Sequence, residues 1–220
     1  MTTIAIVGAG RGLGAAVARQ FGREGFDVAL IARNEHRVKA LATDLGSDGV
    51  NARGFTADVR DPSSIAATLE EITESIGPIE VLQYSPLPQK DFMRPVLETT
   101  PAELVGPIEF SVYGPVAAVR QVVPGMRFLK RGTILFVNGG TAVRPKPDFA
   151  GTSVAFAAQS AYAEMLHDEL AGDDIHVAQL IIPGAIDPES DTKSPEAIAK
   201  KLWDIHTGRE EFRHFAEPLD

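Results

Sequence analysis

Short apolar runs alternate with amphipathic stretches along most of the chain. The apolar runs are rich in valine and isoleucine and predict buried strands at residues 4–7, 27–32, 51–57, 79–83, 132–138 and 175–182. Stretches with helical periodicity fall between them, at residues 15–21, 36–45, 61–76, 101–129, 153–171 and 194–206. Alternating strands and helices indicate βαβ units, so we predict an α/β fold with a doubly wound parallel sheet of the Rossmann type.

Glycine and proline mark the boundaries of these elements. Pro62 follows Asp61 at the start of one predicted helix, and Pro183-Gly184 ends the last long strand. The proline-rich segment 84–99 is predicted to be a loop, and the prolines within 101–129 predict a kinked or interrupted helix. Residues 212–216 predict a short edge strand. Because no linker or internal repeat is present, we expect residues 1–220 to form a single domain.

The first strand runs directly into a glycine-dense turn and then a helix. The turn contains Gly8, Gly10, Arg11, Gly12, Leu13 and Gly14. A diphosphate can approach backbone N–H groups closely where no Cβ intrudes, and the following helix directs its positive end at the same place. The spacing is G-x-x-x-G-x-G. An ordinary tight turn is the alternative, but the position between strand and helix favours a phosphate-binding loop.

Charge and composition limit the ligands that we expect. The 220 residues carry a net charge of −9 and include no cysteine. An acidic chain is a poor partner for nucleic acid or an anionic membrane, and the lack of cysteine excludes disulfides and thiolate metal ligands. No long apolar run or leader pattern is present. We therefore expect a cytoplasmic protein that binds a small molecule, with no metal site.

Two arginines suggest which dinucleotide would bind. The residue that ends the second strand commonly accepts from a ribose hydroxyl when acidic and accommodates a 2′-phosphate when it is arginine. Here it is Arg33, and Arg11 lies within the glycine turn. Two guanidinium groups favour a phosphate, so we predict NADP(H). Asp58, after the third strand, could accept from the adenine amino group or cap the next helix.

The order and spacing of these motifs resemble the short-chain dehydrogenase/reductase family over residues 3–186. The resemblance rests on the glycine turn, Asp58-Val59, the end of the fourth strand, the glycine-bounded fifth strand and Pro183-Gly184-Ala185-Ile186. It implies a Rossmann-type fold and a nicotinamide cofactor whose carboxamide is contacted by backbone near Ile186. It also implies cofactor contacts at Val59, Ser85, Pro183 and Gly184, and assembly as a homodimer or homotetramer. Val7 replaces the family's threonine before the first glycine.

The family's catalytic residues are absent at the matching positions. Its Asn-Asn-Ala-Gly falls on Gln83-Tyr84-Ser85-Pro86, and its remaining asparagine, serine, tyrosine and lysine fall on Ser111, Gly139, Thr152 and Phe156. In the family, a lysine and the cofactor lower the pKa of the tyrosine phenol until it can deliver a proton. Threonine is a far weaker acid and phenylalanine supplies no cation, so that proton relay cannot operate here.

Three hypotheses remain. The first is an atypical NADPH-dependent reductase of a small carbonyl, enone or imine. Its proton would come from water held by Thr152, Ser111 or Thr141, or from Tyr84 or Lys146. The second is an inactive NADP-binding regulator or scaffold. The third is a non-redox lyase, isomerase or cyclase. Because the chain after Ile186 is short, we also expect a relatively open substrate site without a long lid.

Overall fold

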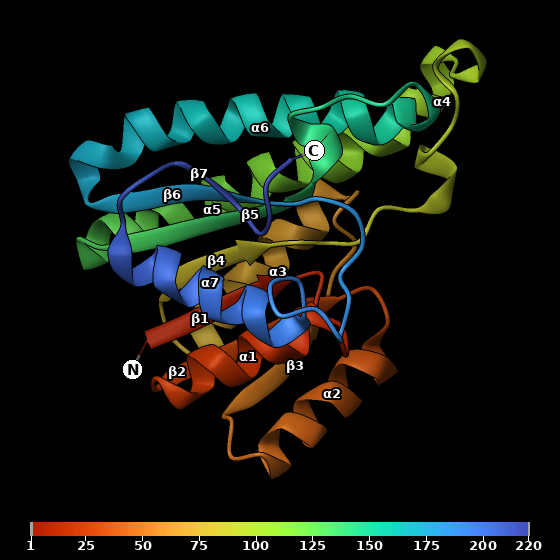
Figure 1. The fold of residues 1–220 in the computed structure, drawn as a ribbon. Helices are drawn as coiled ribbons and strands as arrows, with labels where there is room; N and C mark the ends of the chain where they lie inside the picture. The colour runs from red at the N-terminus through yellow and green to blue at the C-terminus, as the bar shows by residue number, and fades with distance from the viewer. Residues whose placement is uncertain (1, 220) are drawn as a thin grey trace.

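The computed structural model describes residues 2–219 as one α/β domain built on a single parallel sheet (Figure 1). The strand order is β3-β2-β1-β4-β5-β6-β7. The strands are β1 (Thr2–Val7), β2 (Phe26–Ala32), β3 (Ala52–Thr56), β4 (Ile79–Tyr84), β5 (Gly132–Gly139), β6 (Ile175–Ile182) and β7 (Arg213–Phe215). The predicted Rossmann-type doubly wound sheet is confirmed, including the short edge strand at its end.

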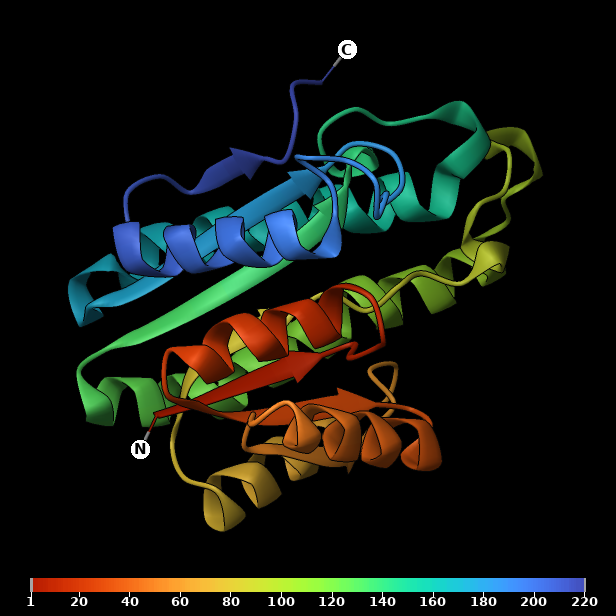
Figure 2. The same ribbon diagram turned by 60° about the horizontal axis from the view of Figure 1, so that its bottom comes forward.

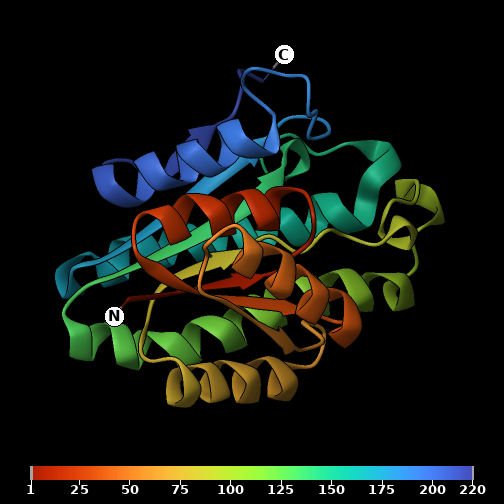
Figure 3. The ribbon, with the colours of Figure 1, turned by 90° about the horizontal axis from the view of Figure 1, so that it is seen from below.

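Helices cover both faces of the sheet. One face carries α1 (Leu13–Arg23), α2 (Glu35–Ser47) and α7 (Pro195–Gly208), and Figures 2 and 3 show α1 beside α7. The other carries α3 (Pro62–Ser75), α5 (Gly114–Leu129) and α6 (Ala150–Leu170). In β1, Ile4 and Ile6 pack on the first face while Ala5 and Val7 pack on the second. Burial on both sides explains why the strands are apolar without interruption.

The topology places a crevice beside β1. Strand β1 pairs with β2 on one side and with β4 on the other, and the chain proceeds outward from this point in both directions. Connections from neighbouring strands therefore leave toward opposite faces at the carboxyl ends of β1 and β4. The glycine turn that joins β1 to α1 lies at this switch point.

The stretch 101–129 is interrupted as predicted, directly before Pro115, which lies in the first turn of the helix that follows the break. It forms α4 (Pro101–Ile108), the π-helical turn η3 (Glu109–Tyr113) and α5, with Pro107 and Pro124 accommodated inside α4 and α5. The Arg60 guanidinium donates to the Glu109 carboxylate from Nε at 2.9 Å and from a terminal nitrogen at 2.6 Å. The π turn is therefore tied to the loop that precedes α3.

Among the boundaries that differ from the prediction, two lie near the predicted active site. Helix α6 begins at Ala150 rather than at residue 153, so position 152 lies inside the helix. The predicted loop 84–99 begins one residue later, because Tyr84 belongs to β4, and it includes the short 3₁₀ turns η1 (Lys90–Phe92) and η2 (Val96–Glu98). Local hydrogen bonds of this kind satisfy the backbone of a long connection without a regular element.

Candidate cofactor and active site

Gly8 and Gly14 are required by the packing of the turn itself. Gly8 has φ +91°, and a Cβ on it would lie 2.4 Å from the Pro86 Cα at the end of β4. A Cβ on Gly14 would lie 2.9 Å from the Ala9 Cα. The two glycines let the turn fold back on itself and press against the segment after β4.

Gly10 and Gly12 face open space. A Cβ on either residue would meet no heavy atom within 4 Å. Gly12 is also the N-cap of α1, whose first turn receives no hydrogen bond from a capping side chain. Helix N-terminal N–H groups bind anions in this situation. These two positions therefore fit a diphosphate, and the turn passes the geometric test for a dinucleotide.

A cavity of about 1140 Å³ extends from this turn along the ends of β1 and β2 to the start of α2. Ala32, Val59 and Leu87 give it apolar walls, and Phe110 of the π turn also lines it. The cavity is large enough for an adenosine half, with hydrocarbon surfaces suited to a flat base. Val59 lines this cavity, and the Ser85 N–H, next to the lining residue Pro86, donates to the Val7 carbonyl at 3.0 Å. The cofactor contacts predicted for Val59 and Ser85 stay predictions.

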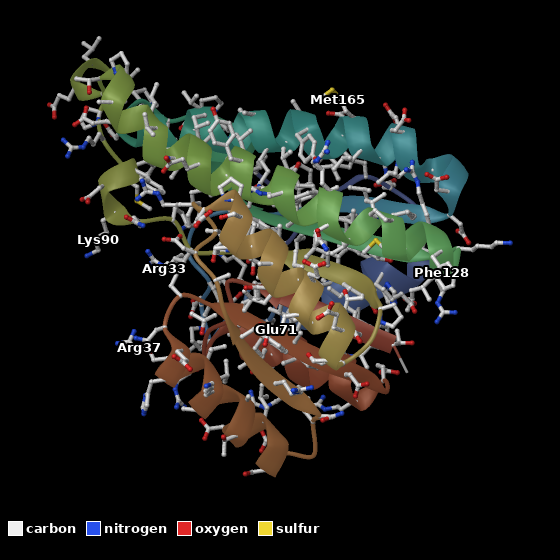
Figure 4. The ribbon with its side chains drawn as sticks, turned by 180° about the vertical axis from the view of Figure 1, so that it is seen from behind. Arg33, Arg37, Glu71, Lys90, Phe128 and Met165 are labelled. Atoms are coloured by element: carbon white, nitrogen blue, oxygen red, sulfur yellow. The ribbon has the colours of Figure 1, made fainter. Side chains whose placement is uncertain are left out.

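Basic side chains gather at the outer end of this cavity. Arg11, Arg33, His36 and Arg37 all line it, and Figure 4 shows Arg33 and Arg37 at the same edge of the molecule. Arg11 also contacts Asp44 of α2 at 3.0 Å, an exposed pair that directs its guanidinium toward α2. The Asn34 Oδ1 accepts from the Arg37 N–H at 2.9 Å and caps α2. Helix α2 thus presents its positive end and its basic side chains to the same space.

Asp58 does not cap the next helix. That cap is Asp61, whose carboxylate accepts from the N–H groups of Ser63 and Ser64 at 2.9 and 3.3 Å. Asp58 is exposed and accepts from the Arg60 N–H at 3.0 Å. The capping alternative is therefore wrong, and the adenine role of Asp58 stays a prediction.

The segment after β6 lies beyond β4 and β5, where the nicotinamide half would extend. Gly184 has φ +72°, and a Cβ on it would lie 4.0 Å from the Lys193 Nζ. Lys193 also donates to the Pro183 carbonyl at 3.5 Å. Ile186 is exposed in the same segment, and Leu13 is half-buried at the first turn of α1. The contacts predicted for these positions stay predictions.

Hydrocarbon occupies the two positions at which the sequence predicts the loss of the family's serine and lysine. A Cβ on Gly139 would lie 3.8 Å from Cε2 of Phe156, so the ring stands beside the position where a serine side chain would project. Phe156 is 7% exposed and clusters with Ala142 and Ile181. The large side chain of Phe156 thus fills space beside Gly139, which has no side chain.

The hydroxyl candidates are close to the same region but differ in their surroundings. The Thr152 hydroxyl donates to the Phe149 carbonyl at 3.2 Å, and Thr152 is buried within α6. Ser111 is buried in the π turn, whereas Thr141 is half-buried in the 3₁₀ turn η4 (Gly140–Ala142) after β5. Lys146 is exposed in the loop before α6. Within residues 2–219, no group of three His, Asp or Glu side chains has the arrangement of a metal site.

Comparison with known proteins agrees with this geometry. The family model for short chain dehydrogenases matches residues 2–199. The chain belongs to this family. It is 28% identical to a fatty acyl-CoA reductase of Mycobacterium tuberculosis over 82% of this chain and 62% of that protein. It is also 28% identical to a 3-oxoacyl-[acyl-carrier-protein] reductase of Bos taurus, over 98% of this chain and 86% of the other.

The chain spans 62% and 60% of the lengths of two curated relatives, the second a short chain dehydrogenase of Pseudocercospora fijiensis. Among solved structures, a short-chain dehydrogenase from Rhodopseudomonas palustris aligns with a TM-score of 0.86 and 25% identity, covering 99% of both chains. A short-chain oxidoreductase of Pseudomonas aeruginosa, described as containing an atypical catalytic center, aligns with a TM-score of 0.84 and 18% identity over 97% of this chain and 94% of that one.

Tyr84 is not available as the proton donor in this short-chain dehydrogenase. Its side chain is 2% exposed, and its hydroxyl donates to the Phe110 carbonyl at 2.7 Å. Burial, followed by the charge of Asp58, raises the pKa of Tyr84 well above 10. A Cβ on Gly114 would lie 2.7 Å from the same hydroxyl. The structure therefore corrects the expectation for Tyr84, whose phenol joins β4 to the π turn.

The segment after β7 reaches the turn that follows β5, and the open substrate site stays a prediction. The loop 187–194 is closed by the Asp187 N–H, which donates to the Lys193 carbonyl at 3.2 Å. Lys193 pairs with Glu217 from the segment after β7 at 3.0 Å, and Leu219 of that segment packs beside Gly140. The segment after β7 is short, but it reaches Gly140 because it starts at the edge strand next to β6.

Sequence reasoning did not single out His36, Arg37, Lys193 or Glu217. His36 and Arg37 lie one helical turn after Arg33, a spacing that predicts a shared direction once the bounds of α2 are known. The sequence gives no such signal for the Lys193–Glu217 pair, because its members are 24 positions apart and a complete helix lies between them. Only the return of β7 to the sheet edge brings them together.

Proposed function

We propose that this short-chain dehydrogenase is an NADP(H)-dependent reductase of a small carbonyl, enone or imine. The observation that carries this proposal is the convergence of Arg11, Arg33, His36 and Arg37 on the cavity at the open glycine turn. When bound, NADPH supplies a hydride for the acceptor carbon, and one proton completes the reduced product. A proton from water balances the reaction and leaves NADP⁺ and hydroxide.

Different residues of this chain would bind the diphosphate and the 2′-phosphate. Gly10 and Gly12 leave room for the diphosphate, and the N-terminus of α1 supplies N–H donors. Arg33 and Arg37 supply charged donors for a 2′-phosphate, which forms stronger hydrogen bonds with guanidinium than a neutral hydroxyl does. The solved structure of a metagenomic short-chain oxidoreductase in complex with NADP, 24% identical with a TM-score of 0.85 over 100% of this chain and 97% of that one, has the same fold.

The proton would reach the product through water rather than through a side-chain phenol. Thr152, Ser111 and Thr141 are the hydroxyls near the Gly139–Phe156 position, and each can orient a water molecule without titrating. Lys146 lies on an exposed loop and stays a second candidate. A hydroxyl-held water is a weak acid, so we expect turnover to increase little between neutral pH and mildly acidic pH.

A second function is favoured by the apolar acceptor end. Phe156 and its neighbours provide no charged group there, which suits a protein that binds NADP(H) and serves as a regulator or scaffold without turnover. Oxidation of NADPH in the presence of ketones, enones and imines, followed through the nicotinamide absorbance, distinguishes the two functions. Tight NADPH binding without oxidation by any acceptor would support the second function and reject the first.

Arg33→Asp tests the choice of cofactor. The substitution should weaken NADPH binding by roughly 10- to 100-fold, because a charged hydrogen bond to phosphate is lost and repulsion replaces it. NADH binding should change little. Titration of nicotinamide fluorescence measures both affinities. Arg23→Asp, an equal charge change at the opposite end of α1, is the matched control. Equal losses for NADPH and NADH would contradict the 2′-phosphate assignment.

We also infer a homodimer or homotetramer in the cytoplasm. Exposed apolar side chains on α5 and α6, including Phe128 at 87% and Met165 at 63%, support an assembly surface, and Figure 4 shows both residues in one view. The absence of cysteine is compatible with a reducing compartment. In the part of the chain that the structure describes, every helix is too short or too polar to cross a bilayer. Sedimentation analysis tests the assembly, and fractionation of cells tests the location.

A further inference from the structure

A separate apolar cluster lies at the carboxyl ends of β5 and β6, on the side covered by α6. Its buried members are Ala142, Phe156 and Ile181, and the half-buried side chains packed on it are Val143, Phe215 and Leu219. The cluster includes the position of the family's lysine and adjoins Gly139. Hydrocarbon therefore packs around the position that matches the family's lysine.

Leu219 comes to this cluster from the far edge of the sheet. Strand β7 pairs in parallel with β6, and the Ala216 N–H extends the pairing by donating to the Ile181 carbonyl at 2.9 Å. The chain then continues beyond the sheet edge (Figure 2) as residues 217–219, which we term the strap. Cδ2 of Leu219 lies 3.5 Å from the point where a Cβ on Gly140 would stand. The strap thus touches the turn that follows β5.

An ion pair holds the strap in this place. The Glu217 carboxylate contacts the Lys193 Nζ at 3.0 Å and also accepts from the Thr192 hydroxyl. The side chains of Lys193 and Glu217 are 21% and 33% exposed, so solvent screens their pair less than it screens a surface pair. Because Lys193 also donates to the Pro183 carbonyl, the pair connects the strap to the end of β6.

We propose that Leu219 is a specificity-determining residue. Held by the Glu217–Lys193 pair, it joins Phe156 in confining the acceptor site to molecules that present hydrocarbon, such as alkyl and aryl ketones or enones. A polyhydroxylated acceptor would lose its hydrogen bonds to water against the cluster without gaining partners. This inference deepens the proposed reductase function and rests on it for the position of the acceptor.

Leu219→Ser in the 220-residue chain tests the proposal, with propiophenone and dihydroxyacetone as acceptors. The wild-type protein should reduce propiophenone with the higher kcat/KM. Leu219→Ser should lower that value roughly tenfold, the effect of losing about two buried methylene groups, and leave dihydroxyacetone unchanged or improved. Glu217→Gln should shift selectivity in the same direction by a smaller factor. Leu97→Ser is the matched control, because Leu97 is 97% exposed on η2.

A binding measurement separates this inference from the reductase proposal. Calorimetric titration of the NADPH-loaded protein with 1-phenyl-1-propanol, which cannot accept hydride, should show binding that Leu219→Ser weakens and Leu97→Ser does not. If this holds while no acceptor oxidises NADPH, the reductase function fails and the apolar site stands. Equal alcohol affinity in wild type and in a folded Leu219→Ser variant would overturn the inference. An equal increase of kcat/KM for both ketones in Leu219→Ser would also overturn it, because Leu219 would then block access to the site without selecting between acceptors.

Discussion

Gly8 and Gly10 lie two residues apart in one turn, and their surroundings separate a structural role from a ligand-facing one. The space beyond Gly8 is filled by the backbone of Ser85 and Pro86, whereas the space beyond Gly10 is open. A side chain at Gly8 would therefore strain the apoprotein, and a side chain at Gly10 would meet only a ligand. The same residue type is thus required for two physical reasons.

Substitution by alanine separates these two roles. Gly8→Ala should lower the free energy of unfolding by roughly 2–5 kcal/mol, because of its positive φ and the backbone clash. Gly10→Ala should leave stability within about 0.5 kcal/mol and weaken NADPH binding by about tenfold or more. Urea unfolding and fluorescence titration measure the two effects. Unchanged NADPH affinity in a stable Gly10→Ala protein would contradict diphosphate binding at this turn.

At the scale of elements, the π turn η3 lies between α4 and α5 and borders the cavity at the glycine turn. It carries Phe110, which lines the cavity, and Ser111, which falls on a catalytic position of the family. Tyr84 of β4 fixes the turn through the Phe110 carbonyl, and Arg60 fixes it through Glu109. The extra residue of a π turn changes which side chains face the site, so the alignment of α4 and α5 depends on these contacts.

Tyr84→Phe tests whether this tyrosine is structural. The Phe110 carbonyl would lose its donor in a buried place, which should cost about 1 kcal/mol in the free energy of unfolding. Because the hydroxyl donates to backbone rather than facing the acceptor, turnover and NADPH affinity should change less than about threefold. Urea titration and steady-state kinetics give these values. A hundredfold loss of kcat with little loss of stability would restore Tyr84 as the proton donor.

At the scale of the whole molecule, the two ends of the sheet have different roles. The carboxyl ends of the strands carry the turn, the cavity and the strap, as expected for a doubly wound sheet. Three histidines make aromatic contacts near the opposite ends of β5 and β6. The ring centroids of His167 and His176 are 6.0 Å apart, and His206 packs against Trp203. These rings are remote from the predicted chemistry and bear on stability.

Acidification should destabilise the protein through His176. Burial, followed by the positive charges of Arg209 and the neighbouring histidines, lowers the pKa of His176 to about 4. The folded state therefore keeps it neutral, while the unfolded chain takes up a proton near pH 6.5. The contribution of neutral His176 to the free energy of unfolding is fully present above pH 6.5 and is lost as the pH falls toward 4. Between pH 7.5 and pH 5 the free energy of unfolding should decrease by about 2 kcal/mol.

Thermal unfolding of wild type and His176→Leu at several pH values checks this expectation. The variant should lose a large part of the decrease in Tm between pH 7.5 and pH 5. Burial also lowers the pKa of His206, so that residue should account for part of the remaining decrease. An identical decrease in both proteins would assign the acid sensitivity to other groups.

The sequence by itself determined the parallel sheet and the order of its elements, and it predicts the phosphate-binding turn, the basic cofactor end and the loss of the family's catalytic residues. These features depend on periodicity and on neighbours within one βαβ unit, so short stretches such as 4–14 already contain the information. Tertiary structure alone decided that Tyr84 is buried, that Phe156 lies beside Gly139, and that the strap reaches Gly140. Such contacts join residues distant in sequence, and their partners are selected by the register and order of the strands rather than by local pattern.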